Sequence, residues 1–244
     1  MAAITWTREI AEAYDATSAE MFTDAVLGPT LDCLESLAAG GAALEFAVGT
    51  GRVALPLAAR GVPVQGIELS EAMLEQLRRK AGGEALPVTL GDMAHTRVDG
   101  RFRLVYLVYN TLMNLTTQAE QVAVFANAAA HLEPGGAFLL EVIVPGIGRV
   151  APGELGRVFT LEADHIGTET FDDPLGQISW SHHWMRVDGR LVQHAAPYRY
   201  VWPSELDLMA QLAGLRLRAR WSDWAGSPFT AASTNQLVIY ERPA

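Results

Sequence analysis

The chain has 244 residues, half of them apolar, and a net charge of −10 at neutral pH. That length accommodates one large α/β domain or two small ones, and no apolar stretch is long enough for a membrane helix. Binding to nucleic acid depends on clustered Lys and Arg that neutralise phosphates, and the sequence has no such cluster, so we expect neither nucleic-acid nor membrane partners.

Cysteine content and the N-terminus bear on the compartment. Cys33 is the only cysteine, so no disulfide and no cysteine-built metal site can form within the chain. The first residues lack the basic-then-apolar pattern of a signal peptide. These features favour a cytoplasmic protein. The histidines and acids do not follow a zinc-ligand order either, so no metal is expected. The oligomeric state, a homodimer included, stays open.

The N-terminal segment is predicted to be helical. Apolar residues recur at helical spacing from residue 7 to residue 37, and Gly28-Pro29 is expected to break the run.

The strongest motif lies at residues 44–52, Leu-Glu-Phe-Ala-Val-Gly-Thr-Gly-Arg. The apolar residues predict a buried strand that stops at Gly49-Thr50-Gly51, and a helix pattern starts at Val53. A strand, a glycine turn and a helix in this order open a nucleotide-binding α/β unit. The glycines allow a tight turn, and the helix start offers unpaired N–H groups.

Three carboxylates favour one class of nucleotide. Glu45 lies inside the first strand, Glu68 ends the apolar run 62–67, and Asp92 ends the run 86–91 and precedes Met93. The position of Glu68 after the glycine turn suits the two hydroxyls of a ribose. Carboxylates without a phosphate-binding Lys favour a cationic, phosphate-free nucleoside, and S-adenosylmethionine is such a molecule.

Strands and helices continue to alternate up to residue 144. A strand is predicted at 102–109, and Thr117 and Glu120 form a capping box that opens a helix to about Leu132. A turn at 134–136 leads into a strand at 137–144. This alternation predicts a parallel sheet with helices on both faces.

Residues 145–200 break the alternation. They contain strand-like runs, and Asp188-Gly189 is a strong signal for a two-residue hairpin. A segment of this size makes a poor independent core, so it is interpreted as an antiparallel insertion in one domain. A helix at 204–212 and strands at 215–221 and 236–241 close the chain. The strand-like runs are 158–162, 169–171, 178–187 and 190–201.

Four stretches resemble the motifs of the class I S-adenosylmethionine-dependent methyltransferases in order and spacing, over about residues 40–144. They are Glu45–Gly51, Gly66–Ser70 with Met73-Leu74, Gly91–Met93 and Leu132–Gly136. One departure is Ala47, where the family usually carries glycine.

The resemblance implies a Rossmann-like fold with a mostly parallel seven-stranded sheet whose last strand is antiparallel. Residues 1–244 would then form a single methyltransferase domain. It would comprise an N-terminal helical lid (1–38), a cofactor-binding core (39–144), a substrate-side insertion (145–200) and a closing helix with a strand hairpin (201–244).

The resemblance also implies the cofactor S-adenosyl-L-methionine, its product S-adenosyl-L-homocysteine, and roles for named residues. The Gly49 region would hold the methionine end, with Glu45 orienting the turn or the amino group through water, and Glu68 would take the ribose hydroxyls. Leu69 and Met73 would pack against the adenine or ribose. Asp92 and Met93 would bind the adenine. The full predicted cofactor set is Glu45, Gly49, Thr50, Gly51, Arg52, Glu68, Leu69, Met73, Asp92, Met93 and Asn110.

The implied activity is methyl transfer to oxygen or nitrogen of a small molecule such as a secondary metabolite or a sugar. Holding the reactants in line can supply an effective molarity of about 10⁵–10⁸ M, whereas a general base adds about 10²–10⁴-fold. Positioning and desolvation are therefore the main expected contributions, and a catalytic side chain is optional.

A tight hairpin would place His183 opposite His194 on one strand face, together with Tyr198 and Tyr200. One of the two histidines is predicted to lie in the acceptor chamber as a general base, while a solvated cross-strand pair is the alternative. The predicted acceptor contacts are Tyr14, Asn114, Tyr198 and Tyr200. Four aromatic residues near the C-terminus could pack the core or line a pocket: Trp202, Trp221, Trp224 and Phe229.

Two other functions remain open at this point. A non-enzymatic S-adenosylmethionine-binding protein would carry the same cofactor residues. An NAD-type oxidoreductase is disfavoured by Glu45 and by the antiparallel closing hairpin.

Overall fold

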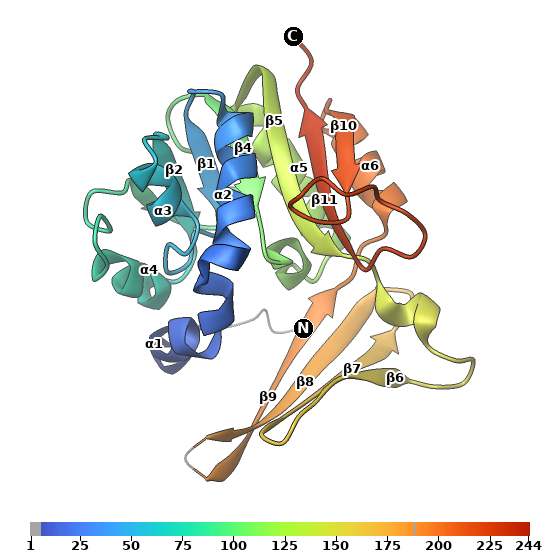
Figure 1. Cartoon of the computed structure of the whole chain (residues 1–244). Coiled ribbons are helices and arrows are strands. Elements are labelled where there is room, and N and C mark those ends of the chain that lie inside the picture. Colours follow the sequence, from blue (N-terminus) through green and yellow to red (C-terminus); the bar gives the residue numbers. More distant parts are fainter. Residues whose placement is uncertain (1–5, 188) are drawn as a thin grey trace.

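A computed structural model describes residues 6–187 and 189–244. Its main feature is a seven-stranded sheet of order β10-β11-β5-β4-β1-β2-β3, in which only β11 runs against its neighbours (Figure 1). This confirms the predicted fold class. The strands are β1 (Ala43–Phe46), β2 (Val64–Glu68), β3 (Val88–Leu90), β4 (Phe102–Leu107), β5 (Leu132–Ile143), β10 (Arg216–Trp221) and β11 (Asn235–Glu241).

Helices cover both faces of this sheet because successive side chains of the central strands point to opposite sides. In β4, Val105 and Leu107 join one core cluster and Leu104 and Tyr106 join the other. The first cluster includes α5 (Gln118–His131) and α6 (Pro203–Leu212), and the second includes α2 (Asp24–Ala38), α3 (Ala54–Ala59) and α4 (Glu71–Arg78). In the part of the chain that the structure describes, no helix is both long and apolar enough to cross a membrane.

The N-terminal segment is helical, but the expected break at Gly28-Pro29 is wrong. The chain forms α1 (Arg8–Thr17), a 3₁₀ turn η1 (Ala19–Phe22) and then α2, which continues through Pro29. Proline removes one helical hydrogen bond. Leu31 and Leu34 bury their side chains beneath the sheet and offset that loss. The breaks fall instead on either side of η1.

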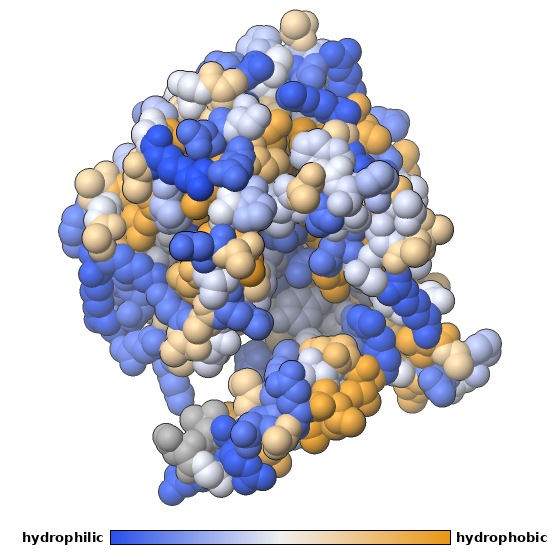
Figure 2. Space-filling model, in the orientation of Figure 1, coloured by the Kyte–Doolittle hydropathy of each residue, from blue (hydrophilic) through white to orange (hydrophobic). Residues whose placement is uncertain are grey.

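Residues after β5 form η3 (Gly146–Arg149) and a second, four-stranded antiparallel sheet. Its strands are β6 (Gly156–Leu161), β7 (His165–Asp173), β8 (Ile178–Val187) and β9 (Arg190–Arg199). The predicted pairing of His183 with His194 is confirmed, whereas Asp188 of the predicted turn lies outside the described residues. Figure 2 shows the surface hollowed between this sheet and the body of the molecule.

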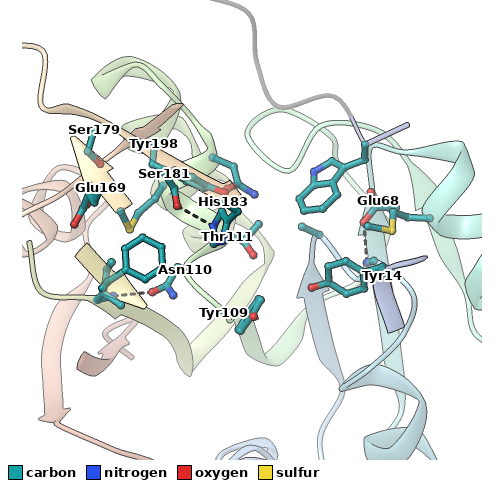
Figure 3. Close-up of a pocket in the computed structure, with 18 of the residues that line it drawn as sticks. Tyr14, Glu68, Tyr109, Asn110, Thr111, Glu169, Ser179, Ser181, His183 and Tyr198 are labelled. Atoms are coloured by element: carbon teal, nitrogen blue, oxygen red, sulfur yellow. Dashed lines mark hydrogen bonds between the residues drawn. The ribbon is translucent and has the colours of Figure 1, made fainter. Parts of the chain in front are cut away.

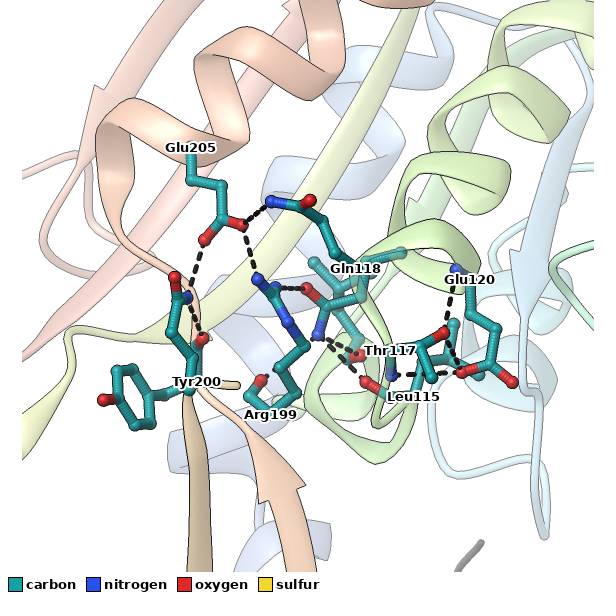
Figure 4. A network of polar contacts seen from close by, with 10 residues as sticks. Leu115, Thr117, Gln118, Glu120, Arg199, Tyr200 and Glu205 are labelled. Atoms are coloured by element: carbon teal, nitrogen blue, oxygen red, sulfur yellow. Dashed lines mark hydrogen bonds and ion pairs between the residues drawn. The ribbon is translucent and has the colours of Figure 1, made fainter. Parts of the chain in front are cut away.

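A polar network fixes the end of β9 to two helices of the body (Figure 4). The Arg199 side chain is 5% exposed and donates to Oε1 of Gln121 (2.5 Å) and Oε1 of Glu205 (2.6 Å). Gln177 and Gln118 also donate to the Glu205 carboxylate. Burial opposes ionisation of Glu205, but these donors outweigh it and lower the pKa of the carboxyl. The network anchors the insertion to α5 and α6.

Candidate active site

The turn after β1 has three residues in the left-handed region: Ala47 (φ 53°), Gly49 (φ 58°) and Gly51 (φ 81°). An L-residue loses about 1–2 kcal/mol there, which explains why the resembled family places glycine at the position of Ala47. A Cβ on Gly51 would lie 2.8 Å from Cδ1 of Leu55. A Cβ on Gly49, by contrast, would meet only the Ala47 carbonyl oxygen, at 4.0 Å. The turn therefore leaves room for a ligand to approach its backbone.

Glu68, at the end of β2, faces this open side. It is 4% exposed, and its carboxylate accepts the N–H groups of Gly49 and Ser70, each at 2.8 Å. Burial raises the pKa of this carboxyl, against the opposing effect of the backbone donors. Each carboxylate oxygen has a further lone pair, and Glu68 lines the cavity described below. The geometry fits the two hydroxyls of a ribose.

We expect Glu68→Ala to weaken cofactor binding by about 1.5–3 kcal/mol, the range for hydrogen bonds to a charged group. That range corresponds to a roughly 10–150-fold higher Kd for S-adenosylhomocysteine in calorimetry. Glu71, exposed at the start of α4, supplies the matched control Glu71→Ala. A cooperatively folded Glu68→Ala protein with the parental Kd would show that Glu68 does not hold the ribose.

Glu45 lies on the other side of the turn. It is 3% exposed, accepts a hydrogen bond from the Tyr106 hydroxyl (3.0 Å) and is also bonded to the backbone of Ala54. Burial raises the pKa of Glu45 to about 8. It does not line the cavity. Of its two predicted roles, the geometry therefore favours support of the turn and of the start of α3.

A cavity of about 510 Å³ separates the body from the insertion. Figure 3 shows Tyr14 and Glu68 on one side of it, and Glu169, Ser179, Ser181 and His183 on the other. Tyr109, Asn110 and Thr111, which follow β4, also line the cavity. The remaining lining residues are Trp6, Ala47, Gly49, Met73, Met113, Asn114, Ile143, Arg157, Phe159 and Tyr198.

The N-terminal helices are held over the glycine turn by polar contacts. Asp15 accepts from the Thr50 hydroxyl (2.6 Å) and pairs with Lys80, and Ser70 donates to the carbonyl of Trp6 (3.1 Å). The Trp6 and Tyr14 rings meet edge to face at 5.8 Å. Burial raises the pKa of Tyr14 to about 12, so its hydroxyl stays protonated at neutral pH.

The residues after β4 adopt a strained turn. Tyr109 and Asn110 have φ values of 58° and 60°. The Tyr109 N–H donates to the Glu141 carboxylate (2.7 Å), which also accepts from the Trp224 indole (2.9 Å). Asn110 Oδ1 accepts the N–H of Ile143 (2.7 Å). The side-chain NH₂ group of Asn110 is therefore left to face the cavity. Such strain is concentrated at functional sites.

The insertion supplies the polar wall. His183 Nε2 lies 3.0 Å from Ser181 Oγ, and its Nδ1 lies 2.8 Å from Nε2 of His165. Burial lowers the pKa of His183, and the nearby His165, His194 and His182 lower it further. Glu169, 8% exposed, accepts from Arg157 Nε at 2.9 Å. This wall therefore presents a neutral imidazole and a buried carboxylate.

Predicted site residues fall into two groups. Those that line the cavity are Tyr14, Gly49, Glu68, Met73, Asn110, Asn114, His183 and Tyr198. His194 and Tyr200 do not line it. His194 is exposed on β9, so His183 is the one of the two histidines that lies at the cavity, as the prediction of one histidine there allows. The predicted place of Tyr200 is wrong, because Tyr200 packs against Phe171 (5.9 Å) in the core. The four aromatic residues near the C-terminus that could have lined a pocket all lie outside the cavity lining: Trp202, Trp221, Trp224 and Phe229.

The other predicted cofactor residues lie outside the cavity lining, and their contacts with the cofactor stay predictions. Asp92 Oδ1 accepts the N–H of Ala94 (2.8 Å), Met93 packs in the core, and Leu69 is 62% exposed. The Thr50 hydroxyl donates to Asp15 of α1, as described above. Gly51 and Arg52 shape the start of α3, with the Arg52 guanidinium 5.2 Å from the Tyr109 ring centre.

Several site residues were missed from the sequence: Trp6, Arg157, Phe159, His165, Glu169 and Ser179. Strand alternation could have found Ser179, because it precedes Ser181 by two residues. Glu169 lies opposite Ser181 across β7 and β8. That register follows a bulge between Thr170 and Asp173, which no short-range signal in the sequence indicates.

Comparisons with known proteins agree with this geometry. A family model described as a methyltransferase domain matches residues 43–136. The chain is 31% identical to the cypemycin N-terminal methyltransferase of a Streptomyces species over 235 residues, 95% of each chain. It superposes on the CcbJ methyltransferase from Streptomyces caelestis with a TM-score of 0.81 and 35% identity, covering 96% of both chains.

A third relative extends the likeness in fold. CalS10, an amino pentose methyltransferase from Micromonospora echinaspora solved with S-adenosylmethionine bound, has a TM-score of 0.72 at 22% identity and covers 99% of this chain and all of its own. The chain thus has the glycine turn, the strand-end carboxylate and the closing antiparallel strand. It also has a methyltransferase relative that matches nearly its full length. The chain belongs to the class I S-adenosylmethionine-dependent methyltransferases.

Proposed function

We propose that this enzyme methylates the nitrogen of a small-molecule amine. When bound, S-adenosylmethionine supplies an electrophilic methyl group. Glu68 and Gly49 would hold the cofactor at one end of the cavity, and the insertion would hold the acceptor at the other. The observation that carries the proposal is the pairing of a buried carboxylate, Glu169, with a neutral imidazole, His183, in the acceptor half.

Glu169 offers a hydrogen-bond acceptor to an ammonium group, while Arg157, which also lines the cavity, balances its charge. One oxygen of Glu169 accepts from Arg157, so the carboxylate keeps further lone pairs toward the cavity. A protonated amine can donate to that carboxylate in a site where the low dielectric strengthens the contact. The same amine must lose a proton before its nitrogen can attack the methyl group, and His183 is placed to take it.

The names of two relatives support nitrogen as the acceptor atom. One acts on a peptide N-terminus. Another, from Streptomyces venezuelae, is a dTDP-3-amino-3,4,6-trideoxy-alpha-D-glucopyranose N,N-dimethyltransferase and is 34% identical over 98 residues, 40% of each chain. The second match covers less than half of either chain, so it is the weaker support for the acceptor.

Different segments of the chain would contact the cofactor and the acceptor. Residues 1–38 would form a lid whose Tyr14 closes the cofactor end, and residues 145–200 would form the acceptor wall. Asn114 and Tyr198 would contact the acceptor. Alignment of the acceptor nitrogen with the methyl group would supply most of the rate enhancement, and proton removal would add to it.

A panel of acceptors tests the proposal. We would incubate the enzyme with S-adenosylmethionine and an aminodeoxy sugar, a tripeptide with a free N-terminus, or a secondary cyclic amine. Each amine is matched by its hydroxyl analogue and its N-acetyl derivative. Mass spectrometry would follow S-adenosylhomocysteine and the methylated product.

We expect product with at least one amine and none with its N-acetyl derivative, because acetylation removes both the nucleophilic lone pair and the positive charge. Methylation of the hydroxyl analogues alone would contradict nitrogen as the acceptor. Cofactor binding without turnover on any member would favour the non-enzymatic alternative.

A further inference from the structure

The hydrogen bonds of the acceptor wall continue beyond the cavity. Ser181 and His183 line the cavity, whereas His165, at the start of β7, does not. Ser181 Oγ lies 3.0 Å from His183 Nε2, and His183 Nδ1 lies 2.8 Å from His165 Nε2. All three residues are partly exposed, and His165 is the one that lies outside the cavity lining. The three groups thus form an unbroken line from the cavity to the surface.

We propose that Ser181, His183 and His165 form a proton path that carries the proton of the acceptor from the cavity to solvent at His165. The proposal rests on the proposed function, because a nitrogen acceptor that arrives protonated must release a proton. Ser181 meets the acceptor nitrogen, and His183 takes the proton through Ser181. His165 acts through His183 and is therefore a positioning and relay residue.

Packing holds the His183 ring in the required orientation. Gly167 lies opposite His183 across β7 and β8, and a Cβ at this glycine would lie 2.3 Å from the Phe159 ring. The missing side chain lets Phe159 lie there and meet the His183 ring edge-on, with ring centres 5.4 Å apart. The rings of His183 and His165 are nearly parallel, at 18°. The ring therefore points at His165 and not at His194, its direct cross-strand neighbour.

The proton balance is simple. In the resting tautomer, His183 carries its proton on Nδ1 and accepts the Ser181 O–H at Nε2. The acceptor nitrogen gives a proton to Ser181 Oγ, Ser181 gives its own to Nε2, and His183 passes the Nδ1 proton to Nε2 of His165. His165 releases its Nδ1 proton to water. When product leaves, water enters the cavity, and one proton moving back through the same bonds restores the tautomers.

The surroundings discourage a resting charge on His183. Among the described residues, its ring nitrogens are hydrogen-bonded only to Ser181 and His165. His194 faces it from β9 and His182 follows it on β8, and burial together with these histidines lowers the pKa of His183. From the other elements at the cavity, Tyr198, Tyr109 and the Arg157–Glu169 pair face the same space. A proton is thus disfavoured from resting on His183.

The first test needs no acceptor. Long-range ¹H–¹⁵N spectra of the full chain with S-adenosylhomocysteine bound report the tautomer of each imidazole. We expect neutral His183 to carry its proton on Nδ1, with Nε2 free to accept. In His165→Leu, which has no acceptor, His183 is expected to change to the Nε2–H form. In His165→Gln, whose side-chain carbonyl can accept, it is expected to stay Nδ1–H.

The second test separates proton passage from orientation. With the best amine of the acceptor panel, His165→Gln is expected to lose between about tenfold and 10²-fold in kcat, below the 10²–10⁴-fold that a general base contributes. Its KM is expected to stay unchanged. The matched control is His182→Gln, because His182 lies on the opposite face of β8 between Trp180 and Trp184. This control is expected to keep the parental kcat.

The outcomes are distinct. An Nε2–H tautomer in the parental protein, or parental turnover and pH profile in His165→Gln, would overturn the proton path. The spectra decide the question even if no amine in the panel is methylated, so failure of the path and failure of the proposed function remain distinguishable.

Discussion

Replacing His183 with glutamine is expected to lower the kcat for a protonated amine by about 10²–10⁴-fold, the usual contribution of general acid–base catalysis. Glutamine keeps a polar group against Ser181 but does not take a proton at neutral pH. The affinity for S-adenosylhomocysteine is expected to be unchanged, because Glu68 and the glycine turn lie on the opposite wall of the cavity.

The lowered pKa of His183 also predicts how activity changes with pH. Burial and the neighbouring histidines lower the pKa of His183 below its ordinary value of 6.5. His183 is therefore neutral and able to act as a base at pH 7, and activity is lost only as the pH falls through that lowered pKa. The parental kcat/KM is expected to show an acid limb below pH 6.5 that is absent in His183→Gln.

An acceptor of weak basicity provides the control. A nitrogen that is already neutral at pH 7 needs no deprotonation before it attacks, so His183→Gln is expected to slow it far less than a protonated amine. Equal loss on both acceptors would assign His183 to substrate orientation. Full activity on both would leave catalysis to positioning alone.

The sequence predicted that the glycine turn and the carboxylate after β2 lie together because their signals are local. The glycine turn and the carboxylate that ends β2 each follow directly from a short apolar strand, and open α/β sheets bind ligands at these strand ends. Gly49 and Glu68 accordingly meet at 2.8 Å. The hairpin register at His183 was also predicted from a local signal, because the Asp188-Gly189 sequence favours a turn that pairs His183 with His194, and these two residues do pair.

His183 and Tyr198 of the acceptor half were predicted, but the residues of β6 and β7 were missed because they depend on contacts between strands that no tight turn joins. His165 hydrogen-bonds to His183 because of the β7–β8 register and because Gly167 leaves space for Phe159. Burial also overrode local preference at Pro29, which lies inside α2. Tyr200 follows the alternation of β9 in the sequence, but it comes after the strand end and turns into the core.

Replacing Arg199 with methionine is expected to lower the free energy of unfolding by about 3–5 kcal/mol, the cost of removing one partner from a buried ion pair. The substitution leaves Glu205 with its charge 14% exposed and without its cation, and it removes the donor to Gln121. Chemical denaturation with intrinsic fluorescence at pH 7 measures the loss. Arg216→Met is the matched control, because the Arg216 side chain is 67% exposed in its pair with Glu241, and exposed pairs contribute about 0–1 kcal/mol.

A double variant separates the ion pair from the packing of its side chains. Arg199→Met combined with Glu205→Gln leaves no unpaired buried charge, so it is expected to be more stable than Arg199→Met alone. The hydrogen bonds from Gln177, Arg199 and Gln118 lower the pKa of Glu205 despite its burial, so this stabilisation is present above the unfolded pKa of about 4.3 and is lost as the pH falls through the lowered value. The difference between the parental protein and Arg199→Met should therefore shrink in acid. A loss equal to that of Arg216→Met, or one that does not change with pH, would mean that the network adds nothing to stability beyond an exposed ion pair.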